Sequence, residues 1–237
     1  MQLELIKNSV EEVFKTFNLD VNIEFVDDVK IRRNEITSID NNVWSEAYET
    51  SYCTGTFIPS TKKHKAFILV LKRDDVGCVI ETVFHEMRHA IDYNIFLKNI
   101  FNNDQDMMKQ SPLYVTFNIY SEFEAIKFGY ENYIKVVDYE GITKQELAER
   151  LLEEGIRIYD DFEIEKNRKG LLYHAVSYFA RLCAVEKFLP NFSKESYLQD
   201  ILEIDLLEGI FTMLVNPDVR DKQWFERFDK LCREYVR

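Results

Sequence analysis

Residues 83–91 read Val-Phe-His-Glu-Met-Arg-His-Ala-Ile, and they lie within the most strongly helical segment of the chain. Apolar residues recur at helical spacing from Val76 to Ile95, which predicts an amphipathic helix of about five turns. Side chains four residues apart lie one above the other on the same helix face. The spacing therefore predicts that His85 and His89 can bind one metal ion together.

Glu86 follows the first histidine directly, so its carboxylate points to the side of the metal where a water molecule would sit. This position suits a general base that takes the proton of an attacking water whose pKa is lowered by zinc. With roughly 2% His and 10% Glu, a chance match to HExxH in a chain of this length is expected about once in a hundred. The alternative is a helix surface that carries two solvated histidines.

A catalytic zinc needs a third protein ligand. Asp92 and Glu81 lie on the same helical face, three residues after His89 and four before His85, but a ligand so close on one helix would strain the site. Each is therefore expected either to orient an imidazole N–H group or to be an ordinary surface charge. The chain lacks the Gly and the third His of an HExxHxxGxxH motif, which excludes the metzincin pattern.

A better donor lies in residues 121–129, which read Ser-Glu-Phe-Glu-Ala-Ile-Lys-Phe-Gly. Ala125 and Gly129 share the helix face of Glu122, and such small residues would let this helix approach the HExxH helix closely. This favours Glu122 as the third ligand. Glu124, on a different face, is the alternative, and a solvated glutamate without a metal is the simplest reading of either residue.

The two motifs HEMRHA and SEFEAIKFG resemble those of the gluzincin metallopeptidases, in which a glutamate on a later helix completes the HExxH site. The second motif is most similar to that of the ImmA/IrrE-type intracellular zincins. The resemblance covers residues 1–135 and implies that Glu122 is the third ligand. It also implies a peptide or protein substrate, such as a transcriptional regulator. Many gluzincins carry Asp four residues after the ligand glutamate, where this chain has Ile126, so the resemblance does not extend to the groups around the ligands.

A peptidase of this class also needs a hydrogen-bond donor that stabilises the tetrahedral oxyanion. His174, in a predicted C-terminal helix, is one candidate, although a histidine there is more often an ordinary helix residue. Most of the 13 Tyr are expected to contribute to the core or the surface. The tyrosine candidates for this donor are Tyr93, Tyr114, Tyr120 and Tyr173.

The pattern along the chain predicts an α+β fold with a zincin-like core. Its expected parts are a helix over residues 8–17, a small and mostly antiparallel sheet with strands over 21–26, 47–52, 54–58 and 66–71, the HExxH helix, and a glutamate helix from Ser111 or Leu113 to Val137. The continuous apolar run over 66–71 fits a buried position in the sheet.

The remainder is predicted to be helical, over residues 143–159, 168–188, 197–215 and 222–235. We therefore expect a zincin-like metallopeptidase core over 1–139 and a helical C-terminal region, packed on that core, over 140–237. The C-terminal region either covers the cleft, recognises a partner, mediates dimerisation or simply completes the fold.

Composition excludes several classes of protein. The formal charge of −12 argues against a nucleic-acid-binding surface, because phosphate contacts need clustered Lys and Arg. No apolar stretch approaches the ~18 residues of a membrane-spanning helix, and the N-terminus lacks the apolar region of a signal peptide. Four scattered cysteines without a CxxC pair are typical of reduced thiols in a cytosolic protein. We expect a cytoplasmic protein that binds neither nucleic acid nor membrane, and the composition leaves its oligomeric state open.

The sequence therefore predicts a zinc metallopeptidase, an intracellular regulatory protease in which His85, His89 and Glu122 bind Zn²⁺ and Glu86 is the general base. Mn or Co also suits these ligands. One rival interpretation is a zincin scaffold that binds a protein partner without catalysis, and another is a metal-dependent hydrolase of a non-peptide bond. We expect an extended peptide substrate to pair by edge addition with the strand over 66–71 or with its neighbour over 54–58.

Overall fold

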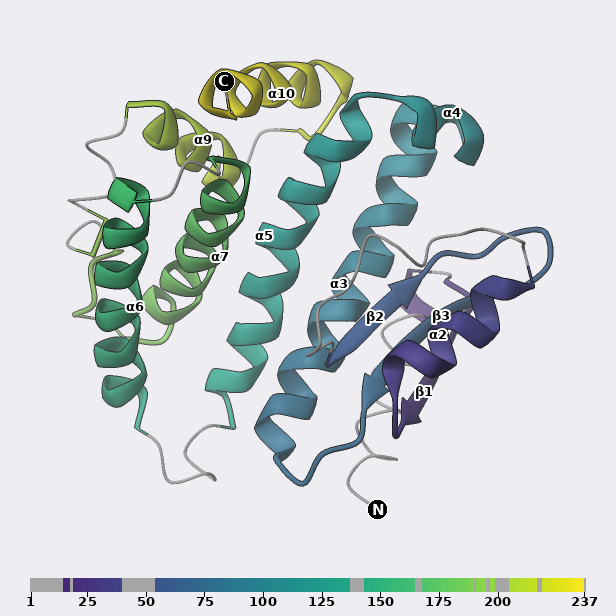
Figure 1. Cartoon of the computed structure of the whole chain (residues 1–237), viewed down its shortest axis with the longest axis horizontal. Helices are drawn as coiled ribbons and strands as arrows, with labels where there is room; N and C mark the ends of the chain where they lie inside the picture. The colour runs from purple at the N-terminus through teal and green to yellow at the C-terminus, as the bar shows by residue number, and fades with distance from the viewer. Residues whose placement is uncertain are drawn as a thin grey trace.

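The protein has an α+β fold in which a small sheet and its flanking helices lie beside a larger group of helices (Figure 1). The computed structural model describes residues 15–17, 19–39, 54–136, 143–164, 168–189, 191–194, 197–198, 205–216 and 219–236. The helix predicted over 8–17 falls largely outside these residues, and the strand predicted over 47–52 falls wholly outside them.

Over the described residues the sheet has three strands, β1 (Val21–Val26), β2 (Gly55–Ile58) and β3 (Ala66–Leu71), in the order β1-β3-β2. The pair β2–β3 is antiparallel, whereas β1 and β3 are parallel along their whole length. The prediction of a mostly antiparallel sheet was therefore wrong, and the sheet is mixed. The cause is helix α2 (Val29–Ser38), which the sequence reading missed and which lies in the crossover that parallel strands require.

The central strand β3 is covered on both faces, which explains its continuous apolar sequence. Ile68 and Val70 pack against the HExxH helix, whereas Leu69 packs against α2 on the opposite face. All three side chains are fully buried. The predicted buried strand over residues 66–71 is thus confirmed, and it separates two small apolar layers.

The HExxH helix is α3 (Val76–Phe101), and the glutamate helix is α5 (Leu113–Ile134), with the short α4 (Gln105–Gln110) between them. Asp75 caps the start of α3 by accepting a hydrogen bond from the Cys78 N–H, 2.8 Å away. The helices α3 and α5 come very close at Gly129, where an added Cβ would lie 2.7 Å from the carbonyl oxygen of Glu81. The small-residue face of α5 therefore lies against α3, as the sequence predicted.

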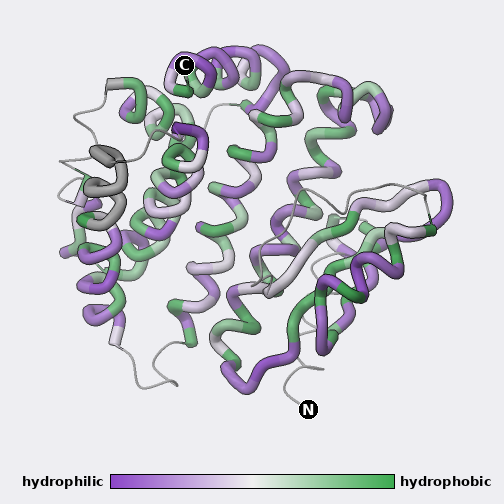
Figure 2. The backbone as a smooth tube through the Cα atoms, viewed as in Figure 1, coloured by the Kyte–Doolittle hydropathy of each residue, from purple (hydrophilic) through white to green (hydrophobic). Residues whose placement is uncertain are grey.

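The C-terminal helices are α6 (Lys144–Ile164), α7 (Arg168–Glu186), α9 (Asp205–Val215) and α10 (Lys222–Val236). The helix α5 lies between α3 and α7, with α10 across one end (Figure 1). Hydrophobic stretches run along α5 and α7 (Figure 2), and Phe123 of α5 stacks on Phe179 of α7 with ring centroids 5.7 Å apart. One apolar core thus joins α3 and α5 to the C-terminal helices. Among the described helices, none has the length and apolar character needed to cross a membrane.

Candidate metal centre

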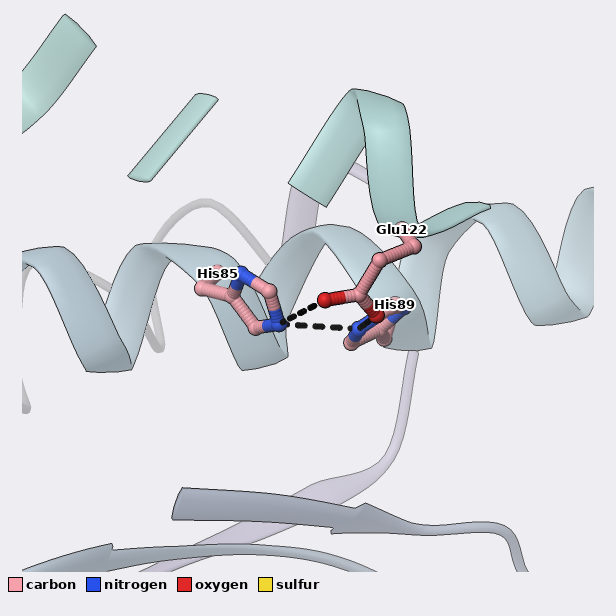
Figure 3. Close-up of side chains that lie close together, drawn as sticks. All are labelled: His85, His89 and Glu122. Atoms are coloured by element: carbon pink, nitrogen blue, oxygen red, sulfur yellow. Dashed lines mark hydrogen bonds and ion pairs between the residues drawn. The ribbon is translucent and has the colours of Figure 1, made fainter. Parts of the chain in front are cut away.

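Two histidines of α3 and one glutamate of α5 converge on a single point (Figure 3). His85 and His89 lie on successive turns of α3, and their Nε2 atoms are 3.0 Å apart. One carboxylate oxygen of Glu122 lies 3.3 Å from His89 Nε2, and the other lies 3.8 Å from His85 Nε2. The side chains are partly buried, with exposed fractions of 20%, 21% and 32%. The three residues named by the sequence are therefore brought together.

The alternative glutamate of α5 has a different role. Glu124 pairs with Arg88, whose Nη2 lies 3.1 Å from its carboxylate, and the Glu124 side chain is only 11% exposed. Lys127 lies 3.5 Å away on the other side. Because Glu124 is held between two cations on another face of α5, the carboxylate that reaches the two histidines is that of Glu122.

The donor atoms lie close enough together to share one metal ion. With bond lengths of about 2.1 Å and a tetrahedral angle, neighbouring donor atoms of a zinc site lie about 3.4 Å apart. The Nε2 atoms of His85 and His89 are 3.0 Å apart, and the two Glu122 oxygens lie 3.3 Å from His89 Nε2 and 3.8 Å from His85 Nε2, respectively. One donor atom from each residue lies within 4.8 Å of the other two, and this donor triangle could hold a metal ion.

Glu86 lies beside this triangle and under the edge of the sheet. Its Oε1 is 4.0 Å from His85 Nε2, and its carboxylate accepts a hydrogen bond from the backbone N–H of Phe57 in β2. The strand can approach so closely because residue 55 is glycine: an added Cβ there would lie 2.4 Å from Cγ2 of Thr82 and 3.1 Å from Cγ of Glu86. Glu86 is 7% exposed. Burial, and to a lesser extent the charge of Glu122, raises its pKa to about 7.

The electrostatics of His85 and Glu122 favour the forms that bind a metal. Burial and the neighbouring His89 lower the pKa of His85 to about 4, which leaves its imidazole neutral near pH 7. Burial opposes ionisation of Glu122, but the hydrogen bond and charges of the two histidines lower its pKa to about 2. His89 shows the reverse balance: burial lowers its pKa, but the hydrogen bond and charge of Glu122, with the charges of Glu86 and Asp92, together raise it, so His89 holds a proton more tightly and must release it to bind a metal. A carboxylate is thus present to neutralise a cation at this point.

The groups around the ligands differ from the sequence prediction. The Nδ1 atom of His89 lies 2.8 Å from the hydroxyl of Ser121, on α5. Asp92, predicted to orient an imidazole or to be a surface charge, does neither: it is 4% exposed and accepts two hydrogen bonds from Arg88, at 3.0 and 2.9 Å. Glu81 is partly buried, and burial raises its pKa while the charge of Arg181 opposes that rise.

The oxyanion donor named from the sequence is not placed at the metal centre. His174 is exposed on α7, and within the described parts of the chain no hydrogen bond or ion pair joins it to the three ligands. The hydroxyl of Tyr93 is buried, and none of the described residues forms a hydrogen bond with it. Tyr120 lies near Arg88, Asp92 and Glu124. Burial, and then the negative charges of Asp92 and Glu124, raise the pKa of Tyr120 to about 12.

Two residues near the centre escaped the sequence reading. Ser121 immediately precedes Glu122, and its 3% exposure and its contact with His89 Nδ1 show that it faces α3. Arg181 projects from α7, pairs with Glu154 of α6 and lies over the ring of Tyr130, 5.9 Å from its centroid. The sequence does mark Arg181 as unusual, because it is the only Asp, Glu, Lys or Arg between residues 171 and 185.

Comparison with known proteins adds no relative: no family model, no curated protein and no solved structure matches this chain.

Proposed function

We propose that this chain is a zinc-dependent metallopeptidase with a gluzincin-like zincin core, in which His85, His89 and Glu122 hold the metal and Glu86 is the general base. The observation that carries the proposal is the convergence of His85, His89 and Glu122, with one donor atom of each within 4.8 Å of the others, beside the buried carboxylate of Glu86. The resemblance of the two helical motifs to those of intracellular zincins supports the same assignment.

The chemistry divides between the metal and the chain. When bound, zinc acts as a Lewis acid that polarises a carbonyl oxygen and lowers the pKa of a water molecule. Glu86 accepts the proton of the attacking water at its carboxylate and passes it to the leaving amine. The hydrogen bond from Phe57 N–H holds this carboxylate in place, and burial keeps its pKa near neutrality, where a group can both take and return a proton.

The sheet edge next to Glu86 suits an extended peptide. Strand β3 is central, so the first strand named from the sequence cannot accept a peptide by edge addition. Strand β2 is at the edge of the sheet over the described residues, and its Phe57 N–H donates to Glu86. The hydrogen bond from Leu71 N–H to the Thr54 carbonyl fixes the alternation of β2, so the Phe57 carbonyl points away from β3 and could accept a hydrogen bond from an extended chain. We propose that the substrate is a peptide or an extended protein segment lying along β2, and a substrate complex without pairing to this strand would refute that part.

Metal content of the chain is the first test. Protein purified without chelator should contain about one zinc, and Glu122→Ala and His85→Ala should each lose it. Glu131→Ala is the matched control, because Glu131 lies on the same helix but pairs with Lys187, 2.6 Å away. A wild type that binds no zinc even after zinc is added back would refute the proposal and favour the partner-binding scaffold.

Activity of Glu86→Gln separates the peptidase from its rivals. This variant should keep zinc and lose peptide hydrolysis, by at least the 10²–10⁴-fold typical of a removed general base. A binding scaffold would be indifferent to the substitution. A hydrolase of non-peptide bonds would lose its activity too, but the wild type would then leave a mixed peptide library uncut.

A further inference from the structure

The hydroxyl of Ser121 lies on the side of the His89 ring opposite the metal ligands' meeting point. Its Oγ is 2.8 Å from His89 Nδ1, while the Nε2 atom of the same ring faces His85 and Glu122. Ser121 is 3% exposed, so water has little access to this contact. The ring is thus held at both nitrogens, and Ser121 is the group that holds it from behind.

The zinc-loaded and the metal-free protein favour opposite tautomers of the neutral His89 ring. When a metal takes the Nε2 lone pair, the proton of the neutral ring must be on Nδ1, which then donates a hydrogen bond. Without a metal, Nε2 lies 3.0 Å from His85 Nε2 and 3.3 Å from a Glu122 oxygen, two groups that accept a proton from it. In the neutral ring the proton then lies on Nε2, and Nδ1 becomes an acceptor.

A hydroxyl can satisfy both tautomers, whereas a carboxylate can only accept. We propose that Ser121 is a positioning residue that holds the His89 ring in its ligand orientation in both the metal-free and the zinc-loaded protein, by exchanging the donor and acceptor roles of its hydroxyl. The proposal rests on the zinc site proposed above. Ser121 and Glu122 are neighbours on α5. When α5 docks on α3, it therefore positions both the ligand Glu122 and the hydroxyl that orients the ligand His89.

Zinc affinity tests the positioning role. In competition with a chelator of known affinity, Ser121→Ala should bind zinc 10–100-fold more weakly than the wild type, and Ser121→Thr, which keeps the hydroxyl, should recover most of the loss. The matched control is Thr116→Val, which removes another buried hydroxyl of α5, one that donates to Asp229 at 2.6 Å. This control should keep wild-type affinity. Wild-type affinity in Ser121→Ala would overturn the proposal.

Histidine NMR gives a readout that a merely structural role would not move. In ¹⁵N-histidine-labelled, zinc-loaded wild type, we expect a slowly exchanging His89 Nδ1–H, and in Ser121→Ala we expect that proton to exchange rapidly. In the metal-free protein at a pH above the pKa of the ring, the same substitution should shift the ¹⁵N resonance of an unprotonated Nδ1. An equally protected Nδ1–H in Ser121→Ala would refute the assignment.

The two proposals fail separately. A wild type that binds no zinc refutes the metallopeptidase, and the metal-free spectra alone then decide whether Ser121 holds the ring. A wild type that binds zinc while the Nδ1 resonance is insensitive to Ser121→Ala leaves the metallopeptidase intact and refutes the positioning role.

Discussion

Replacing Glu86 by Gln should stabilise the metal-free protein at neutral pH. Burial raises the pKa of this carboxyl from its ordinary value of 4.5 to about 7, so the folded state binds its proton more tightly than the unfolded state does. The stability contributed by this proton is fully present below pH 4.5 and is lost as the pH rises through about 7. At 1.36 kcal/mol per pKa unit, the loss amounts to about 3 kcal/mol.

Gln has no charge to desolvate and keeps an oxygen for the Phe57 N–H. The free energy of unfolding of Glu86→Gln minus that of the wild type should therefore grow by up to about 3 kcal/mol across this pH window. Urea denaturation of chelator-treated protein at a series of pH values measures it. The control is Glu226→Gln, on the exposed face of α10. It measures how the same substitution changes the free energy of unfolding when the side chain is exposed to solvent.

A difference between Glu86→Gln and the wild type that stays constant across the window would refute the argument. It would mean that the carboxylate is well solvated in the metal-free protein, and a solvated carboxylate has no raised pKa with which to return a proton to a leaving group. Zinc should reduce the pH dependence, since a nearby cation favours the ionised carboxylate.

Three further outcomes are expected. Gly129→Ala should push α5 away from α3 and lower the free energy of unfolding by about 1–3 kcal/mol. It should also weaken zinc binding, which competition with a chelator measures. The control is Gly209→Ala, whose Cβ would make only ordinary contacts at 3.7 Å and whose free energy of unfolding should rise by about 0.5–1 kcal/mol. Arg88→Met should cost about 3 kcal/mol in urea denaturation, because it leaves the buried carboxylate of Asp92 without its cation and Glu124 with Lys127 alone, and retention of wild-type stability would contradict the pairing. A chain truncated after Tyr139 should lose its helical circular dichroism, because it lacks the helices that cover α5; a folded, zinc-binding fragment would instead favour a separable lid.

The features predicted well from the sequence are local ones. A continuous apolar run identified β3 to the residue, and a helical stripe identified α3, because side-chain periodicity records which faces are buried. The small residues Ala125 and Gly129 correctly marked the face of α5 that approaches α3. The same face carries Glu122, so a helical-wheel argument was enough to prefer Glu122 over Glu124.

The features that escaped prediction depend on contacts between distant segments. The strand order β1-β3-β2 follows from a crossover through α2, whose sequence carries two arginines and no continuous apolar stripe. Asp92 pairs with Arg88 only four residues away on α3, but its 4% exposure and the second carboxylate on Arg88, that of Glu124 from α5, are seen only once the two helices dock. The Ser121 contact likewise spans 32 residues, and no periodicity encodes it.

At the proposed zinc site, metal binding and the docking of α3 against α5 would form one equilibrium. Two ligands come from α3 and the third from α5, so the donor triangle exists only when the helices are at the separation that Gly129 permits. A metal that binds only this state stabilises it by RT ln(1 + [L]/Kd), about 2.7 kcal/mol at a hundredfold excess over Kd. Substitutions between the helices should therefore change stability and zinc affinity together, whereas Glu86→Gln should change activity and metal-free stability while leaving the ligands in place. This difference would distinguish the role of Glu86 as the general base from the role of α3 and α5, which position the metal ligands.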